Sequence, residues 1–223
     1  MLSKGFPVRR SFSNTRSSAI AVGLAGLLFL IYPVVRPYSD ETTMIGAKAM
    51  SSPAWIVAHM SAVIGFILIP LGLLALRDAL PGQSRMAARA LLASWIGVGL
   101  TLPYYGAEIF GVRAIAQRAL DDNNVDLLKA IDDVRYQPVA ETMFASGLLL
   151  LAAGAILAAV TIWRSGALPK WSGVPFAVGF VLFIPQFFTP GPVRVAHGAL
   201  ILVGCAWVAL GMVRMDATTH TAE

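Results

Sequence analysis

Four ionisable side chains lie inside apolar stretches of this sequence, and their types could support acid–base chemistry. His59, Glu108, Glu141 and His197 belong to four separate apolar segments. Ionisable groups are costly to bury in a membrane, so each of them is a candidate for function. Burial brings the proton affinities of carboxyl and imidazole groups closer together, so such a pair can exchange a proton near neutral pH. We therefore expect Glu108 and either His59 or His197 to act as catalytic acid and base.

Other polar residues lie at the same depth as these four. Tyr104 and Tyr105 precede Glu108 by four and three residues, so the three can share one helix face. Pro103 lacks a backbone donor and predicts a kink beside that face. Arg194 precedes His197 by three residues and could pair with Glu108 or Glu141. The residues expected to bind a ligand are Tyr104, Tyr105, Glu141, Gln186 and Arg194.

The same residues allow other interpretations. His59, His197 and a carboxylate are ligand types of a catalytic zinc site with an open position, and two histidines can also hold a haem. Nothing in the spacing selects a metal or cofactor, so both stay unknown. The polar residues could instead form hydrogen bonds that only hold the helices together.

The composition predicts the elements that position these residues. The chain has 223 residues, 57% of them hydrophobic and 13% charged, whereas a soluble domain has about a quarter charged residues. A segment of roughly 20 apolar residues can cross a bilayer as a helix. We expect an all-α, polytopic membrane helix bundle. About six transmembrane helices are predicted, at 18–35, 54–76, 88–112, 139–163, 172–188 and 193–212.

The distribution of Lys and Arg predicts the orientation. Ten of the 17 basic residues lie on the side of the N-terminus, and the longest loop of the opposite side carries four of the others. Because cytoplasmic loops are enriched in Lys and Arg, both termini are expected in the cytoplasm. The expected organisation is a basic cytoplasmic segment 1–17, a membrane domain 18–212 and a cytoplasmic tail 213–223. The basic residues end apolar segments and form no patch with aromatics, which argues against nucleic-acid binding. The expected location is a cell membrane, with the bacterial inner membrane favoured.

The longest connection between predicted spans covers residues 113–138 on the outer side, opposite the termini. Val125, Leu128, Ile131 and Val134 recur every three residues and predict a short amphipathic helix, after Asp and Asn residues suited to capping it. We expect an outer helical hairpin there. It could close over the outer mouth of the bundle, dock a protein partner, or only rest its apolar stripe on the bundle.

The leading functional hypothesis is a membrane-embedded enzyme or binder that holds a small lipophilic molecule in an outward-facing pocket. The alternative is a non-catalytic membrane subunit whose hairpin 113–138 docks a partner protein. Transport is disfavoured because the middle of the predicted spans is apolar. Under the leading hypothesis, replacing Glu108 by Gln abolishes function with little loss of stability. Tyr32, Tyr38, Trp55 and Tyr136 are interpreted as part of an aromatic belt at the outer interface.

Overall fold

The computed structural model describes residues 13–80 and 82–220, and every element in these residues is a helix. Five of the described helices are long and apolar enough to cross a membrane. They are α1 (Ser13–Val35), α3 (Pro53–Ala79), α4 (Ser84–Gly106) with its continuation, α7 (Pro138–Ser165) and α10 (Gly191–His220). The all-helical fold predicted from composition is thereby confirmed, and the five candidate spans are consistent with a multi-pass membrane protein.

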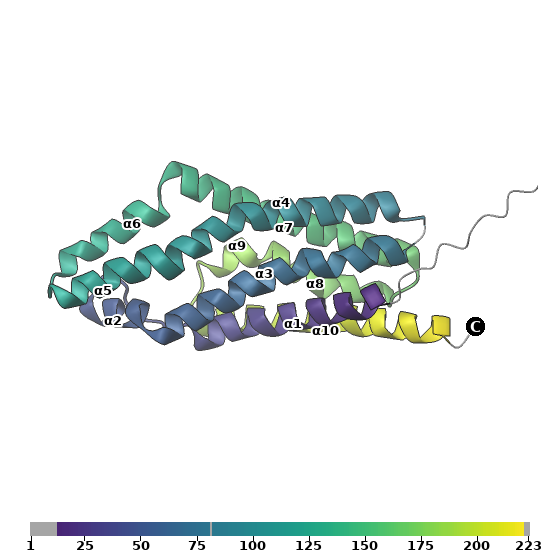
Figure 1. The fold of residues 1–223 in the computed structure, drawn as a ribbon, viewed down its shortest axis with the longest axis horizontal. Coiled ribbons are helices and arrows are strands. Elements are labelled where there is room, and N and C mark those ends of the chain that lie inside the picture. The colour runs from purple at the N-terminus through teal and green to yellow at the C-terminus, as the bar shows by residue number, and fades with distance from the viewer. Residues whose placement is uncertain (1–12, 81, 221–223) are drawn as a thin grey trace, which may run out of the picture.

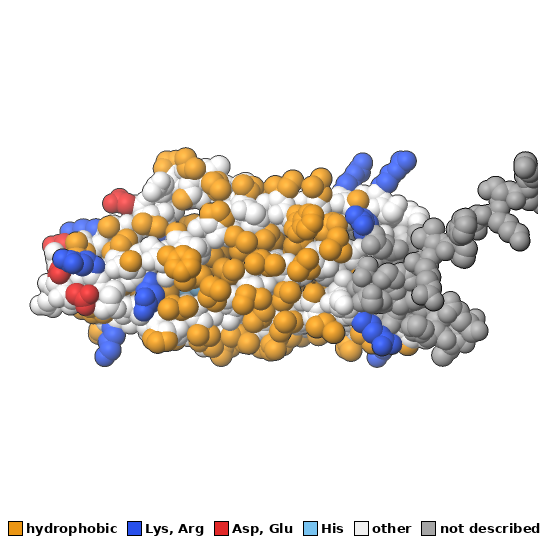
Figure 2. Space-filling model, viewed as in Figure 1, with side chains coloured by type: hydrophobic (Ala, Val, Ile, Leu, Met, Phe, Trp, Pro, Cys, Tyr) orange, Lys and Arg blue, Asp and Glu red, His pale blue; other side chains and the backbone are white. Residues whose placement is uncertain are grey.

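The surface of the bundle fits a lipid environment. Ile20, Leu92 and Leu149 are 68%, 59% and 61% exposed, although they lie in the middle stretches of long helices. Figure 2 shows hydrophobic side chains covering the middle of the rod, while charged side chains gather towards its ends. Water would penalise so broad an apolar band, whereas lipid does not.

The predicted span 172–188 differs from the other five. It consists of one turn of 3-10 helix, η3 (Lys170–Ser172), followed by α8 (Gly173–Val181) and α9 (Phe183–Gln186), with a break at Leu182. Pro185 cannot donate a hydrogen bond to the carbonyl of Val181, which explains why α8 ends there. Neither piece has the length of a spanning helix, so the sixth crossing stays a prediction.

The helices form an elongated bundle in which distant parts of the chain lie side by side. Helix α1 packs against α3 and α10, α4 packs against α7, and α8 fills the space between α7 and α10. Helix α1 begins and α10 ends at the same end of the bundle (Figure 1). We call the opposite end the distal end. The cytoplasmic location of both termini stays a prediction, and residues 1–12 and 221–223 lie outside the described residues.

Small residues allow α4 and α7 to approach closely. A Cβ atom added to Gly97 would lie 2.7 Å from the carbonyl oxygen of Gly147, and one added to Gly147 would lie 2.5 Å from Oγ1 of Thr101. Small residues at such crossings are typical of helix packing in membranes, where backbones gain van der Waals contact. This contact positions the distal parts of α4 and α7 next to each other.

Helix α4 continues beyond the bundle through a change of helical type. The π-helical turn η1 (Ala107–Val112) links it to α5 (Arg113–Asp121). The backbone N–H of Ala107 is shared between the carbonyls of Pro103 and Tyr104. Insertions of this kind re-aim side chains and are frequent at functional sites. Glu108 lies in this turn.

A second hydrophobic core lies at the distal end. It joins α2 (Met44–Ser51), α5, the 3-10 turn η2 (Val125–Lys129) and α6 (Ala130–Arg135), which we call the distal cap (Figure 1). The buried members of this core are Ala47, Met50, Trp55, Val112, Ala116, Ala119, Leu128 and Ile131. Residues 113–138 thus form a helical hairpin, in which Leu128 and Ile131 share a core with α5 and α2, while its outer location stays a prediction. Asn124 caps η2, since its side-chain oxygen accepts from the N–H of Asp126 at 3.0 Å.

Candidate functional site

A cavity of about 550 Å³ lies at the distal end of the bundle. It is lined from α1, α3, α4, η1, α6, α7, α9 and α10 and from the connections between them. The chain contains five tyrosines, and all five line this cavity. They are Tyr32, Tyr38, Tyr104, Tyr105 and Tyr136. The interpretation of Tyr32 and Trp55 as parts of an interface belt is wrong, because their side chains are buried inside the bundle. Tyr38 and Tyr136 line the cavity and are also exposed, so their place in a belt stays a prediction.

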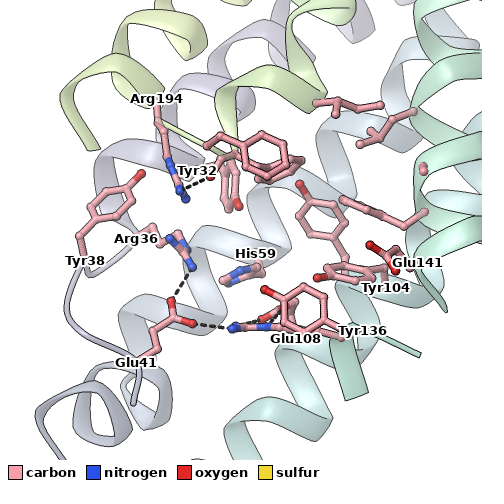
Figure 3. Close-up of a pocket in the computed structure, with 18 of the residues that line it drawn as sticks. Tyr32, Arg36, Tyr38, Glu41, His59, Tyr104, Glu108, Tyr136, Glu141 and Arg194 are labelled. Atoms are coloured by element: carbon pink, nitrogen blue, oxygen red, sulfur yellow. Dashed lines mark hydrogen bonds and ion pairs between the residues drawn. The ribbon is translucent and has the colours of Figure 1, made fainter. Parts of the chain in front are cut away.

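An alternating network of two arginines and two glutamates forms one wall of the cavity (Figure 3). Nε and Nη2 of Arg135 donate to the two carboxylate oxygens of Glu108 at 2.6 and 2.8 Å. Nη1 of Arg135 donates to Glu41 at 2.6 Å, and Nη2 of Arg36 donates to the other oxygen of Glu41 at 2.8 Å. The four charges balance, and the network ties the end of α1 to η1 and α6.

The two central members of this network are largely buried. The side chains of Arg135 and Glu108 are 12% and 8% exposed. Burial alone lowers the pKa of Arg135, but the hydrogen bonds and charge of Glu108 and then of Glu41 outweigh it and raise that pKa above its usual value. Arg135 therefore stays protonated at every pH the protein meets.

The backbone at Glu108 is held as well as its side chain. Nε1 of Trp55, a buried member of the distal-cap core, donates to the carbonyl oxygen of Glu108 at 2.9 Å. The π-helical turn leaves such carbonyls without the regular partner that an α-helix would supply. Trp55 thus couples the position of the carboxylate to the packing of the cap.

His59 lies at the centre of the labelled residues in Figure 3 and is 2% exposed. Its Nδ1 is 2.8 Å from the carbonyl oxygen of Trp55. A carbonyl only accepts, so Nδ1 carries a proton, and Nε2 is the acceptor nitrogen when the ring is neutral. The ring packs against those of Trp55, Tyr32 and Tyr105, with centroids 4.4 to 6.0 Å apart.

Tyr104 and Glu141 lie at the cavity as predicted. The ring of Tyr104 stacks on Phe144 of α7 with a centroid distance of 4.0 Å. Glu141 is exposed in the first turn of α7, and within residues 13–80 and 82–220 it forms no ion pair. Tyr105 is buried beneath them. The shared depth inferred from the sequence therefore brings His59, Tyr104, Tyr105, Glu108, Glu141 and Arg194 to one cavity.

The expected pairing of Arg194 with a carboxylate is wrong. Nε of Arg194 donates to the carbonyl of Thr189 at 2.8 Å, and its Nη2 donates to the carbonyl of Phe187 at 2.6 Å. These carbonyls follow α9, where the chain turns into α10 and helical partners are missing. Glu108 meanwhile is held by Arg135, which the sequence gave no reason to choose.

Gln186 and His197 do not line the cavity, and their predicted roles stay predictions. Nε2 of His197 lies 2.7 Å from the carbonyl oxygen of Gly179, so this nitrogen carries the proton and bonds α10 to α8. The ring of Phe183 meets the imidazole edge-on at 5.3 Å. Gln186 is buried near the end of α9.

The described residues offer no ready metal centre. Within them, no group of three or more His, Cys, Asp or Glu side chains lies close enough to hold a metal ion. A haem held by His59 and His197 would require His197 to give up its bond to Gly179 if Nε2 were the ligand.

Three network residues were missed by sequence reasoning, namely Arg36, Glu41 and Arg135. All three lie in connections between predicted spans, where charged residues are common and had been used only to infer orientation. The one signal available was position, because Arg36 directly follows the first apolar segment and so stays near the membrane boundary.

Comparisons with protein-family models, with curated proteins and with solved structures find no match to this chain, so its function is inferred from the chemistry of the cavity itself.

Proposed function

We propose that this chain is a multi-pass membrane protein that binds a small amphipathic molecule in the distal cavity, with the cavity facing outward and both termini in the cytoplasm. The observation that carries the proposal is the convergence of all five tyrosines of the chain on one cavity. Tyrosine offers an apolar ring and a polar hydroxyl, which suits a ligand with both characters.

The size and lining of the cavity support this proposal. Ligand pockets have volumes of roughly 300–1,000 Å³ and combine apolar walls with a few polar groups. Here the volume is about 550 Å³, and Phe144, Leu148 and Ile184 line the cavity together with the charged network. A wall of this kind can take the apolar part of a ligand while the network faces its polar part.

The ion pairs favour binding over catalysis by Glu108. A carboxylate that accepts two hydrogen bonds from Arg135 must break both before it can take or give a proton efficiently. Glu108 is therefore better suited to positioning Arg135 and the cavity wall than to acid–base transfer. The acceptor Nε2 of His59 still supports a second candidate function, in which His59 acts as a general base on the bound molecule.

Partner docking by the hairpin 113–138 receives less support. Its apolar residues Leu128 and Ile131 are buried in the core of the distal cap. Its surface carries exposed ion pairs such as Arg118 with Asp122, which suit water as well as a partner. No apolar stripe of the hairpin is left to define a docking face.

Native mass spectrometry of the full chain, purified from its host in mild detergent, tests the proposal. Ala145 lines the cavity from α7, whereas the ion network lies on α6, η1 and the loop after α1, so Ala145→Trp places a large side chain in the cavity without replacing a network residue. Leu149→Trp is the matched control on the lipid-facing side of the same helix, where Leu149 is 61% exposed. We expect a bound molecule of defined mass on the wild type and on Leu149→Trp but not on Ala145→Trp. Equal occupancy of both variants, or a bare chain in all three, would contradict binding in this cavity.

A further inference from the structure

The distal cavity is polar on one side and apolar on the other. Helices α7 and α9 and the turn after α9 supply the apolar side, with Phe144, Leu148, Ile184, Phe187 and Phe188. The end of α1, the loop that follows it and the cap supply the polar side (Figure 3). A ligand that fills the cavity would place different chemical groups against the two sides.

Positive charge gathers at one part of the polar side. The guanidinium carbons of Arg36 and Arg194 lie 5.3 and 5.7 Å from the centre of the Tyr38 ring. The charge of Arg36 is balanced within the four-residue network, whereas Arg194 bonds only backbone carbonyls among the described residues. Arg194 therefore adds a positive charge beside Tyr38 that no cavity-lining carboxylate pairs among the described residues, while the neighbouring Asp40 lies outside the lining and is bonded to Thr42.

Two buried donors next to Tyr38 lack a partner. Nε of Arg36 and Oγ of Ser39 are buried, and neither finds a hydrogen-bond partner among the described residues. Both residues line the cavity. Buried polar atoms are paired in the large majority of cases, so unpaired ones indicate a group that is supplied from outside the chain. Since Arg36 Nε can only donate, that group must be an acceptor.

We propose that the distal cavity binds an anionic amphiphile, whose phosphate or carboxylate head lies among Arg36, Ser39 and Arg194 and whose apolar chain lies along Phe144 and Leu148. This inference rests on the proposed function and names the class of ligand. Phosphate and carboxylate oxygens are acceptors that match arginine donors in charge and geometry. Among the described residues that line the cavity, Glu141 is the one carboxylate without an ion pair, and it lies on α7 on the other side of the labelled cluster from Arg194 (Figure 3).

Water-soluble probes with one chain and different heads test the head group. The wild-type chain in maltoside micelles is titrated by calorimetry with octyl phosphate, octanol, octyltrimethylammonium and inorganic phosphate. We expect octyl phosphate to bind at least roughly tenfold more tightly than each of the other three, because only it satisfies both sides of the cavity.

Two variants locate the head. Ser39→Ala removes an unpaired donor and is expected to leave folding intact, while weakening octyl phosphate binding by roughly three- to tenfold and leaving octanol unchanged. Arg194→Gln removes the free charge, and Arg118→Gln is its control on the exposed surface of the cap, where the side chain is 71% exposed. We expect Arg194→Gln, and not Arg118→Gln, to reduce the preference for octyl phosphate over octanol.

The outcomes separate this inference from the proposed function. Octanol or the ammonium probe binding as tightly as octyl phosphate would overturn the anionic head while leaving an amphiphile site. Inorganic phosphate binding equally well would overturn the amphiphile in favour of a free-anion site. Failure of all four probes to bind would overturn both proposals. If Ser39→Ala and Arg194→Gln bind octyl phosphate with the affinity of the wild type, the head group does not lie among Arg36, Ser39 and Arg194, and the proposal is overturned.

Discussion

Replacing Glu108 by Gln should strongly destabilise the protein, because it removes the charge that neutralises Arg135. The carboxylate of Glu108 accepts from Nε and Nη2 of Arg135 at 2.6 and 2.8 Å, and their side chains are only 8% and 12% exposed. The substitution keeps the shape of the side chain and one acceptor oxygen. It leaves Arg135 buried with Glu41 as its remaining counter-charge. This prediction is opposite to the one drawn from the sequence, that the change would cost little stability.

The expected magnitude follows from burial. Breaking a buried ion pair by removing one partner costs about 3–5 kcal/mol, whereas an exposed pair contributes about 0.2–1 kcal/mol. Because Arg135 keeps its bond to Glu41, we expect a loss of about 2–3 kcal/mol, near or just below the lower end of the buried range. Asp122→Asn is the matched control, since its bond to Arg118 lies between side chains that are 38% and 71% exposed.

A double-mutant cycle in detergent measures the coupling between the two residues. The free energies of unfolding of Glu108→Gln, Arg135→Gln and the double variant are compared with that of the wild type. We expect the double variant to cost less than the sum of the singles, with a coupling of about 1–3 kcal/mol, because each single leaves a buried charge uncompensated. A coupling below about 0.5 kcal/mol, similar to that of the control pair, would refute a buried network at this place.

Three further predictions concern packing, pH and topology. Gly147→Ala should lower the free energy of unfolding by about 1–3 kcal/mol, because the added Cβ clashes with α4. Gly99→Ala should be neutral or stabilising, since no atom lies within 4 Å of its added Cβ. Thermal unfolding of both variants checks this prediction. Hydrogen bonds from the hydroxyl and then from the N–H of Thr42 lower the pKa of Asp40 from 3.8. The difference in the free energy of unfolding between the wild type and Asp40→Asn should therefore be constant above about pH 5 and vanish as the pH falls through that lowered pKa. A difference that does not change with pH would contradict these bonds. Arg118→Cys on the distal cap should react with a membrane-impermeant maleimide in intact cells, because the side chain is exposed and the cap is proposed to face outward. The native Cys205 is buried and should not react. Labelling only after lysis would reverse the topology.

The long helices could be predicted because each is a continuous apolar stretch with charged ends. The region 172–188 looked like another such stretch, but Pro185 breaks it into α8 and α9. The short helix α2 escaped prediction although its capping signals are present. Thr43 caps the start of α2 by accepting from the N–H of Gly46. Ser52 ends α2 and caps the start of α3 by accepting from the N–H of Trp55, and a proline follows it as the first residue of α3. An eight-residue helix lacks the length that makes periodicity visible.

The site was partly predictable from depth in the membrane. Residues such as His59 and Glu108 occur at the same end of antiparallel helices, so they had to approach one another. The partners Arg36, Glu41 and Arg135 lie in connections, and their meeting depends on how the cap folds on the bundle. Spacing along the chain carries no information on that contact, because Arg135 is 27 residues from Glu108 and 94 from Glu41.

The tyrosines show the limit of a rule based on depth alone. Tyrosine at a membrane boundary is typical of an interface belt, and depth cannot tell a side chain facing lipid from one facing inward. Tyr32 is 8% exposed and faces His59, while Tyr136 is 62% exposed yet still lines the cavity mouth. Only the rotation of each helix about its axis distinguishes these cases.

Fluorine NMR of the protein labelled with 3-fluorotyrosine tests the central claim most directly, because every tyrosine signal comes from the cavity. A sample labelled with fluorotryptophan serves as the control, since none of the tryptophans lines the cavity and all but Trp55 lie away from it. On titration with octyl phosphate or octanol, we expect saturable shifts of several tyrosine signals and unchanged signals from Trp95, Trp163, Trp171 and Trp207. Tyrosine signals that stay in place with both probes, or that move only in parallel with those tryptophans, would contradict ligand binding in the distal cavity.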